Sequence, residues 1–286
     1  MAPAPDLGRL TAAIRAGYQG EPGAYSEEAL LAVFPDAVAV GHRTFQLAVD
    51  ALLAGEVDAD VLPVENTLFG IVQEVNDLLW ERGGLSVVGE HVLPIRHCLL
   101  GRRSEPVRRA LSQPQALAQV TRYLESRNIE PVPFYDTAGA ARHLAQHPEP
   151  GLAAVASAQA AARYGLEVLA DGIQDDDSNQ TRFLVTQRGQ PRRPGQGRPG
   201  EKSSLAFVTA HQPGSLLEAL ACFSSRGVNL TRLESRPIPH LPFQYRFFLD
   251  FEVDNPQAAE AALCELEISA LEVRLFGTYA AHSSRN

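Results

Sequence analysis

The chain contains little sulfur. Its 286 residues include three cysteines and one methionine. Cys98, Cys222 and Cys264 lie far apart and are odd in number, which argues against a disulfide framework and favours reduced thiols in a reducing compartment. The sequence has no CxxC motif, no HExxH motif and no spaced cluster of histidine and cysteine, so no metal site is expected.

Long apolar runs and a positive charge balance are also missing. No stretch approaches the roughly 20 apolar residues of a membrane-spanning helix. The first 15 residues lack the apolar core of a secretory signal. The formal net charge of -9 argues against nucleic acid and anionic membrane surfaces as partners. We therefore expect a cytoplasmic protein.

The composition itself is that of an ordinary globular protein, with 45% hydrophobic and 21% charged residues. The length favours about two domains. Residues 188–202 read RGQPRRPGQGRPGEK, and their density of glycine, proline and arginine predicts an exposed linker. We therefore expect domains at residues 14–188 and 203–280, joined by a linker at 189–202.

The first part alternates strand and helix signals, which favours an α/β domain. Ser26 is the expected N-cap of its first helix, and Pro114 the expected first turn of a later one. Strands are predicted near 16–18, 61–64, 85–100, 153–156, 167–170 and 181–185, and helices at 27–34, 45–53, 71–79, 114–123 and 158–164.

The second part has a different pattern. Apolar residues alternate strictly from Phe243 to Val253, which predicts a half-buried strand. Further strands are predicted at 205–208, 228–233 and 271–275, with helices at 213–227 and 259–266. The order βαββαβ is that of a ferredoxin-like split unit.

Two loops at expected strand ends carry groups suited to an organic anion, since open α/β sheets bind ligands at such positions. In GEPGAYSE, the glycines of residues 20–27 allow close backbone approach and Ser26 offers a hydroxyl at a helix start, although a simple N-cap is equally consistent. In PVENTLFG, Glu65, Asn66 and Thr67 follow a buried strand, and a plain turn hardly needs all three.

Two further loops have the same character. Ser112-Gln113-Pro114-Gln115 begins a helix, where a cap is the commoner role. Thr181-Arg182-Phe183 follows an acidic loop and places a hydroxyl, a guanidinium and an aromatic ring side by side. Taken alone, this tripeptide is more often an ordinary strand start with a solvated arginine, so its meaning depends on the other segments.

Together these segments resemble the prephenate dehydratase family. The family pattern contains a GxxG-[TA]-[FY]-S loop, P-[IV]-E-N-S, H-C-L, S-H-P-Q-A-L and T-R-F. The chain has GEPGAYSE, PVENTLFG, HCLL at residues 97–100, SQPQALAQ and TRF in the same order. The resemblance covers nearly the whole chain after about Ala16. It implies a two-lobed, periplasmic-binding-protein-like α/β catalytic domain.

The second part resembles an ACT regulatory domain. GSLLEAL stands where the family has G-A-L, and residues 234–237 match its E-S-R-P motif. The resemblance implies that phenylalanine is an effector bound between paired ACT domains, and hence a homodimer or homotetramer. The implied effector residues are Gly214, Ser215, Leu216, Leu217, Asn229, Leu230, Glu234, Ser235, Arg236 and Pro237.

The chemistry that this resemblance implies is the loss of carbon dioxide and water from prephenate, a carbon–oxygen lyase reaction that gives phenylpyruvate. Aromatisation drives it, so no cofactor is required. Thr181 is implied to donate a proton or hydrogen bond to the departing hydroxide, Arg182 to hold a substrate carboxylate and Phe183 to pack near the ring. Orientation of the substrate and of Thr181 falls to Glu65, Asn66 and Thr67, and further substrate contacts to Tyr25, Ser26 and Gln115.

Several alternatives stay open. The segments GAYSE, VLPVEN, DTAGAA and VLADGIQDD look most like the plant arogenate dehydratase branch, which acts on the 1-amino analogue of prephenate. Thr67 replaces the usual serine, and Gln113 replaces the usual histidine, which puts proton transfer at position 113 in doubt. Outside this class stand a non-catalytic small-molecule binding protein and a purely regulatory amino-acid sensor.

Overall fold

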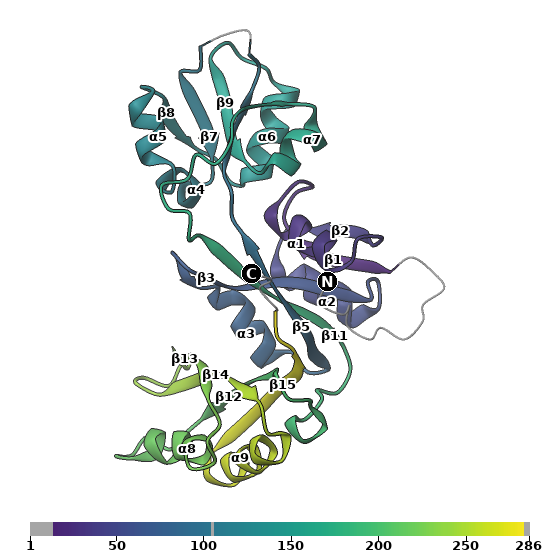
Figure 1. Ribbon diagram of the computed structural model, residues 1–286, viewed down its shortest axis with the longest axis vertical. Helices are drawn as coiled ribbons and strands as arrows, with labels where there is room; N and C mark the ends of the chain where they lie inside the picture. Colours follow the sequence, from purple (N-terminus) through teal and green to yellow (C-terminus); the bar gives the residue numbers. More distant parts are fainter. Residues whose placement is uncertain (1–13, 104–105, 283–286) are drawn as a thin grey trace. The chain divides into compact units, whose positions relative to one another are not determined.

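The computed structural model describes residues 14–103 and 106–282 (Figure 1). The segment examined for a secretory signal lies outside them up to residue 13. Two compact units share the chain. Of the described residues, the two-lobed unit contains 14–72 together with His91–Phe183, and the C-terminal unit contains Gln73–Glu90 and 184–282. Among the described residues, no helix has the length and apolar character that a bilayer crossing requires.

The first lobe of the two-lobed unit contains three parallel strands in the order β3-β1-β2. Its helices are α1 and α2, and β4 pairs antiparallel with the end of β3. The next strand beside β3 is β11, whose first residues belong to this unit. The bounds are β1 Arg15–Gln19, α1 Tyr25–Val33, β2 Val38–His42, α2 Phe45–Ala54, β3 Ala59–Asn66, β4 Gly70–Ile71 and β11 Gln180–Arg188.

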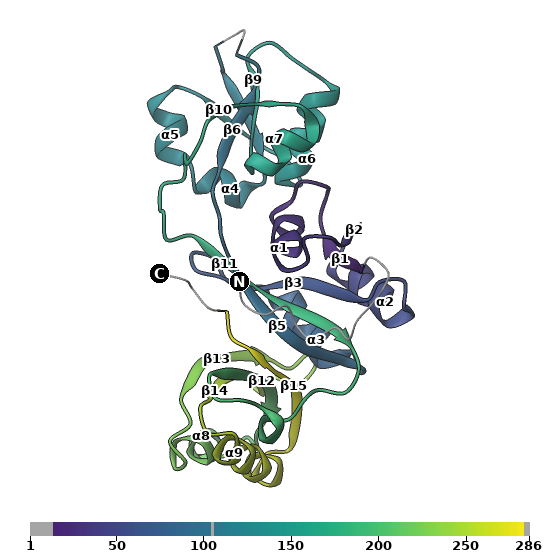
Figure 2. The same cartoon turned by 45° about the vertical axis from the view of Figure 1, so that its right-hand side comes forward.

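The second lobe is a five-stranded mixed sheet in the order β10-β6-β9-β7-β8 (Figure 2). Its core includes Leu99, Ala110, Val120 and Val155. The bounds are β6 Cys98–Gly101, β7 Arg109–Ser112, α4 Pro114–Ala118, α5 Thr121–Ser126, β8 Glu130–Pro133, α6 Thr137–Gln146, β9 Leu152–Ala156, α7 Ala158–Tyr164 and β10 Glu167–Ala170. The expectation of a two-lobed α/β domain is confirmed.

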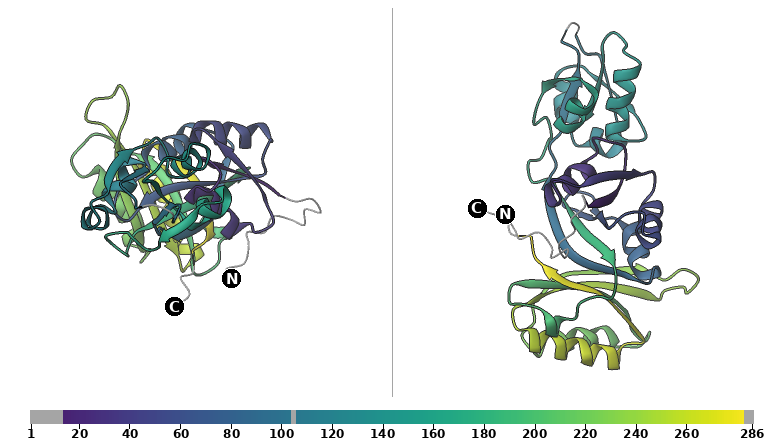
Figure 3. Two further views of the ribbon diagram at one scale, coloured as in Figure 1. Left: turned by 90° about the horizontal axis from the view of Figure 1, so that it is seen from above. Right: turned by 90° about the vertical axis from the view of Figure 1, so that its right-hand side faces the viewer.

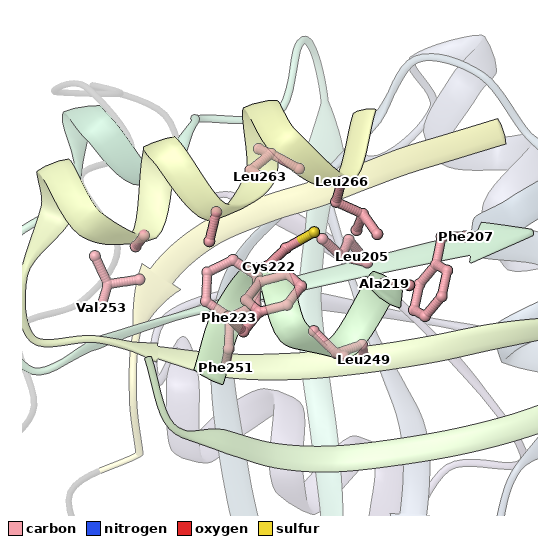
Figure 4. Close-up of a cluster of buried hydrophobic side chains, with 12 residues drawn as sticks. Leu205, Phe207, Ala219, Cys222, Phe223, Leu249, Phe251, Val253, Leu263 and Leu266 are labelled. Carbon is pink, nitrogen blue, oxygen red and sulfur yellow. The ribbon is translucent and has the colours of Figure 1, made fainter. Parts of the chain in front are cut away.

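The C-terminal unit has the expected βαββαβ order in a sheet β13-β14-β12-β15. Helices α8 and α9 cover one face of this sheet (Figure 3), and phenylalanine and leucine side chains fill the space between them (Figure 4). Elements α3 and β5 begin in the same unit, and β15 pairs with β5 at Ala280 and Gly89. The bounds are α3 Gln73–Glu81, β5 Leu85–Pro94, β12 Glu201–Val208, α8 Ser215–Ser224, β13 Leu230–Pro237, β14 Tyr245–Val253, α9 Pro256–Ser269 and β15 Glu272–Ala280.

Three local expectations were wrong. The strand expected from Phe243 begins at Tyr245, because Phe243 is exposed and has a positive φ of 61. Ser26 is not an N-cap, because α1 begins two residues earlier than expected, at Tyr25 after Ala24. Gly23, at φ 91, donates its backbone N–H to the Glu27 carboxylate instead, 2.5 Å away. The helix expected at 114–123 is divided into α4 and α5, because Val120 leaves helical geometry to enter the core.

The linker-like stretch is folded onto α9. Arg193 pairs with Glu260 at 2.6 Å and with Glu267 at 2.8 Å, while Pro194 is buried. Arg192 pairs with Glu201 at 2.6 Å. The composition predicted an exposed linker, and it did not reveal that the arginines of this stretch meet the carboxylates of a helix. The residue limits of the domains stay a prediction.

A buried carboxylate lies in the first lobe without a hydrogen-bond partner among the described residues. Asp60 on β3 is fully buried, and both of its carboxylate oxygens are unpaired. It lies beside Gly17 of β1. A side chain at position 17 would collide with Asp60, because its Cβ atom would stand 2.1 Å from Asp60 Oδ1 and 3.4 Å from His42 Nε2. Burial raises the pKa of Asp60 to about 8, so the folded protein keeps it protonated near neutral pH.

This carboxyl group makes the stability of the fold depend on pH. Between the unfolded pKa and about 8, the folded chain holds a proton that the unfolded chain has released. Unfolding therefore becomes more favourable as pH rises, by up to about 1.4 kcal/mol per pH unit. Asp60→Asn should flatten this slope in urea unfolding measured from pH 6 to 9, whereas Asp36→Asn, at an exposed site, should not. Equal slopes in all three proteins would contradict the prediction.

Candidate active site

The end of β3 and the start of β11 are joined by three hydrogen bonds around Thr67. Its backbone N–H donates to the carbonyl of Gln180 at 2.9 Å. Its hydroxyl donates to the carbonyl of Ser178 at 3.0 Å and accepts from the backbone N–H of Gln180 at 3.0 Å. A threonine meets these demands as well as a serine does, so its departure from the usual residue leaves the joint intact. Two segments that the sequence separates by more than a hundred residues therefore form one site.

The side-chain amide of Asn66 has a fixed orientation in this site. Its oxygen accepts from the backbone N–H groups of Leu68 at 2.9 Å and Phe69 at 3.0 Å. Because those groups only donate, the amide nitrogen must point the other way, where it donates to Asn179 Oδ1 at 2.8 Å and to Thr181 Oγ1 at 2.9 Å. The Thr181 oxygen acts as an acceptor here, so its own hydrogen is left to donate elsewhere.

The fixed order of hydrogen-bond donors and acceptors continues into the second lobe. Asn179 donates from Nδ2 to Gln119 Oε1 at 2.8 Å, and His97 Nε2 lies 2.5 Å from that oxygen. An amide oxygen cannot donate, so His97 Nε2 must carry a hydrogen. Tyr25 reaches His97 Nδ1 with its hydroxyl at 2.8 Å. We call Tyr25, His97, Gln119, Asn179, Asn66 and Thr181 the polar chain.

Burial shifts the pKa values of His97 and Tyr25, which lie at the opposite end of the polar chain from Thr181. It lowers the pKa of His97, against an opposing contribution from the hydrogen bond to Gln119. It raises the pKa of Tyr25 well above the ordinary value. A neutral His97 with hydrogen on Nε2 accepts at Nδ1, and the Tyr25 hydroxyl donates to it. The Arg96 carbonyl, 2.8 Å from the same hydroxyl, offers a second acceptor.

The other expected substrate residues lie at varied depths. Arg182 places its guanidinium 3.7 Å from the Glu65 carboxylate, and its side chain is only 12% exposed. Phe183 is 1% exposed, so core packing accounts for its position better than contact with a substrate ring does. Ser26 is buried in the first turn of α1. Gln115 is exposed on α4, and among the described residues it makes no hydrogen bond to the polar chain.

The loop before α1 holds the two lobes together. Ser157 donates to the carbonyl of Gly23 at 3.0 Å, and Tyr164 donates to that of Pro22 at 2.6 Å. Arg142 pairs with Glu21 at 2.7 Å. A cavity of about 390 Å³ lies beside this loop, and no residue of the polar chain lines it. Its walls are Gln19, Gly20, Glu21, Pro22, Gly41, His42, Arg43, Tyr135 and Asp136.

The expected effector residues lie in the C-terminal unit on two faces of its sheet. Gly214, at φ 89, precedes α8, whose first turn contains Ser215, Leu216 and Leu217. Asn229 donates to the Glu252 carboxylate at 2.9 Å. Ser235 and Pro237 lie opposite Phe247 and Tyr245, on the face that α8 and α9 cover, whereas Glu234 and Arg236 lie on the other face. Leu230 packs against the core beneath those helices.

Sequence reasoning missed three members of the polar chain. Gln119 and Asn179 received no role, and His97 was noted only as part of a motif. Asn179 stands two residues before Thr181, so its place in the site was open to inference. Gln119 lies at the break between α4 and α5, which a continuous helix prediction concealed. Among the described residues there is no group of three or more His, Cys, Asp or Glu side chains that could hold a metal ion.

Two solved structures resemble this geometry at 30% identity or more. A prephenate dehydratase in complex with L-Phe from Arthrobacter aurescens is 30% identical, with a TM-score of 0.83 over 93% of this chain and 90% of that one. GqqA, described as a novel type of quorum quenching acylase, is 34% identical, with a TM-score of 0.87 over 95% of this chain and 100% of that one. The prephenate dehydratase of Staphylococcus aureus, at 23% identity and a TM-score of 0.79, supports the fold alone.

Named relatives and a family sequence model indicate the same family as these solved structures. Arogenate dehydratase/prephenate dehydratase 2 of Arabidopsis thaliana is 42% identical over 279 residues, which is 93% of this chain and 72% of that protein. Arogenate dehydratase 2 of Petunia hybrida is 41% identical over 94% of this chain and 72% of its own length. The sequence model for prephenate dehydratase matches residues 16–191. This chain therefore belongs to the prephenate dehydratase family.

Proposed function

We propose that this protein is a prephenate dehydratase, a carbon–oxygen lyase that forms phenylpyruvate, carbon dioxide and water for phenylalanine biosynthesis. One observation carries the proposal. The Thr181 hydroxyl accepts a hydrogen bond from the Asn66 amide at 2.9 Å, and because no described residue accepts its hydrogen, that hydrogen can be donated to a substrate oxygen. This hydrogen bond supports Asn66 as the group that polarises the Thr181 hydroxyl, which is a weak acid on its own.

The chemistry assigns each group a task. Hydroxide is a poor leaving group, and a positioned donor contributes on the order of 10²–10⁴-fold to its departure. Thr181 is that donor, and the Asn66 N–H stabilises the negative charge that develops on its oxygen. Arg182, mostly buried beside Glu65, supplies a cation for a substrate carboxylate. Glu65 limits the freedom of that cation.

A second candidate function is arogenate dehydration, which yields phenylalanine directly. The observation that favours it is the set of Arabidopsis and Petunia relatives, which carry the name arogenate dehydratase at 38% to 42% identity. Both substrates lose the same groups, so the Thr181 geometry serves either. An acylase activity, as GqqA is described to have, fits less well if Thr181 were its nucleophile. Such a hydroxyl needs a base, whereas the Asn66 nitrogen only donates.

Side-by-side turnover of prephenate and arogenate separates these functions. Phenylpyruvate from prephenate, at a higher kcat/KM than phenylalanine from arogenate, supports the leading proposal. The reverse order supports the second candidate. Binding of either substrate without any product would instead identify a non-catalytic binding protein, and an acyl-amide substrate completes the comparison.

The Thr181 hydroxyl should be indispensable for turnover. Thr181→Ala should fold normally and lose at least ~10²-fold in kcat, the contribution of one positioned donor. Thr181→Ser should keep most of the activity. Thr186→Val is the matched control, because it removes a buried hydroxyl from the same strand that has no hydrogen-bond partner in the part of the chain that the structure describes. Near-normal turnover by a folded Thr181→Ala protein would exclude Thr181 from the reaction.

The orientation of Asn66 should matter as much as its presence. Asn66→Asp keeps an oxygen facing the N–H groups of Leu68 and Phe69 but replaces the donor to Thr181 with an acceptor. We expect kcat to fall by about 10²-fold, as for loss of an oriented donor. Asn255→Asp is the control, because Asn255 accepts two backbone N–H groups in the same way at the start of α9. Equal activity of both variants would refute the assigned polarity.

Regulation, assembly and location complete the proposal. The βαββαβ unit acts as an ACT domain, residues 203–280 form its sequence module, and phenylalanine binds where paired copies meet. The chain is then a homodimer or homotetramer. The Arthrobacter aurescens relative, which is described as a complex with L-Phe, supports this assignment. Free thiols at Cys98, Cys222 and Cys264 support a reducing cytoplasmic location.

Phenylalanine should bind the intact protein and change its activity. A coupling of typical size changes substrate affinity by about 5- to 150-fold. Calorimetry gives the affinity, and turnover with increasing phenylalanine gives the response. Binding without any change in kcat or KM would leave the effector role unsupported, and the absence of binding would refute the sensor assignment.

A further inference from the structure

Arg236 points away from the helix-covered face of its sheet and binds α3. Its Nε and Nη2 atoms lie 3.0 Å and 2.5 Å from the two carboxylate oxygens of Asp77. Its Nη1 atom donates to the side-chain oxygen of Gln73. Gln73 begins α3, and Asp77 follows it by four residues on the same side of the helix. One guanidinium therefore holds the whole first turn of α3.

Asp77 also reduces the repulsion between two arginines of the sheet. Arg236 on β13 and Arg246 on β14 are directly opposite each other, and like charges in such a pair are unfavourable. Arg246 is 7% exposed, lies over the Trp80 ring at 4.1 Å and reaches Asp77 at 4.0 Å. Asp77 thus stands between two arginines, and Trp80 of the same helix covers the second. Helix α3 therefore supplies the groups that stabilise both arginines of the sheet.

The start of α3 is joined by a short piece of chain to the loop that contains Asn66. Strand β4 pairs antiparallel with the end of β3, Ile71 with Glu65 and Gly70 with Asn66. The backbone N–H of Val72 then donates to the carbonyl of Val64 at 3.0 Å, and the next residue is Gln73. No flexible spacer separates the Arg236 contact from the strand pair that supports Asn66.

The two faces of β13 make this contact suitable for regulation. Ser235 and Pro237 lie on the face of the proposed effector site, and Arg236 between them lies on the α3 face. Since β13 is an edge strand, a ligand at Ser235 can move it without breaking a second strand pair. A small shift of β13 then changes the geometry of the Arg236–Asp77 pair directly.

We infer that Arg236 is a positioning residue for the Asn66 loop, and that phenylalanine alters turnover by displacing Arg236 relative to Asp77 and Gln73. The inference rests on the proposed dehydratase function. It assigns Arg236 to the transmission of the effector signal rather than to contact with the effector.

The full-length protein tests this with three variants. Arg236→Met and Asp77→Asn should each lower kcat about fivefold or more and abolish the kinetic response to phenylalanine. Calorimetric binding of phenylalanine should persist. Backbone N–H groups of residues 66–72 should exchange hydrogen faster, a readout that needs no activity. The double variant with Arg236→Asp and Asp77→Arg keeps an opposite-charge pair and should restore the response in part.

Arg193→Met is the matched control. It removes an arginine that binds two carboxylates in the same unit but touches α9 rather than α3. The inference is overturned if Arg236→Met keeps the wild-type response and exchange rates, or if Arg193→Met loses as much. If the wild type converts neither prephenate nor arogenate, the dehydratase proposal fails instead, and the exchange rates still decide whether Arg236 positions the loop.

Discussion

The site depends on one constraint, the anchoring of the Asn66 side-chain oxygen by two backbone N–H groups. That pair of bonds fixes which way the Asn66 amide faces, and every later partner must match it. Asn179, Gln119 and His97 follow with alternating donors and acceptors, and Thr181 receives the remaining hydrogen. Amides whose partners are fixed need little reorganisation when charge develops nearby, which is the condition for strong electrostatic stabilisation.

The polar chain also explains why the site lies between two lobes. Asn66 comes from the first lobe, Gln119 from the second, and Asn179 from the segment that returns from the second lobe to β11. A hydrogen-bond chain of this kind is complete only when the lobes are close together. The bonds of Ser157 and Tyr164 to the loop before α1 hold that arrangement from another side. The contact between the lobes and the site therefore share the residues Asn66 and Asn179.

The sequence predicted much of the fold because periodicity reports local structure. The βαββαβ order is found in the C-terminal unit, and the alternating apolar residues form β14, which begins at Tyr245 rather than at Phe243. Thr181 and Asn66 were recognised because they stand in matching motifs, and the structure brings them within hydrogen-bond distance. Gln119 was not identified as a site residue because its position depends on a break between two short helices. Asp77 was not identified because an acidic residue on an amphipathic helix is normally solvated. Nothing in its local sequence shows that it contacts two arginines that follow about 160 residues later.

The placement of α3 shows why sequence modules and compact units need not coincide. Residues 73–90 lie inside the stretch that matches the family, yet their contacts place them with the C-terminal sheet. The buried side chains of α3 include Leu79 and Trp80, and Arg246 of the sheet covers the Trp80 ring. Glu90, 1% exposed, pairs with Lys202 at 3.0 Å and binds the backbone of His282. Cutting the chain after residue 202 would remove Arg246 and Arg236 from α3 and His282 from Glu90. The loss of these partners would disturb α3 itself, and through Val72 the strand pair beneath Asn66. Deleting the C-terminal sheet would therefore not leave the first part of the chain as it stands in the intact protein, because α3 packs against that sheet and continues directly from the strand pair at Asn66.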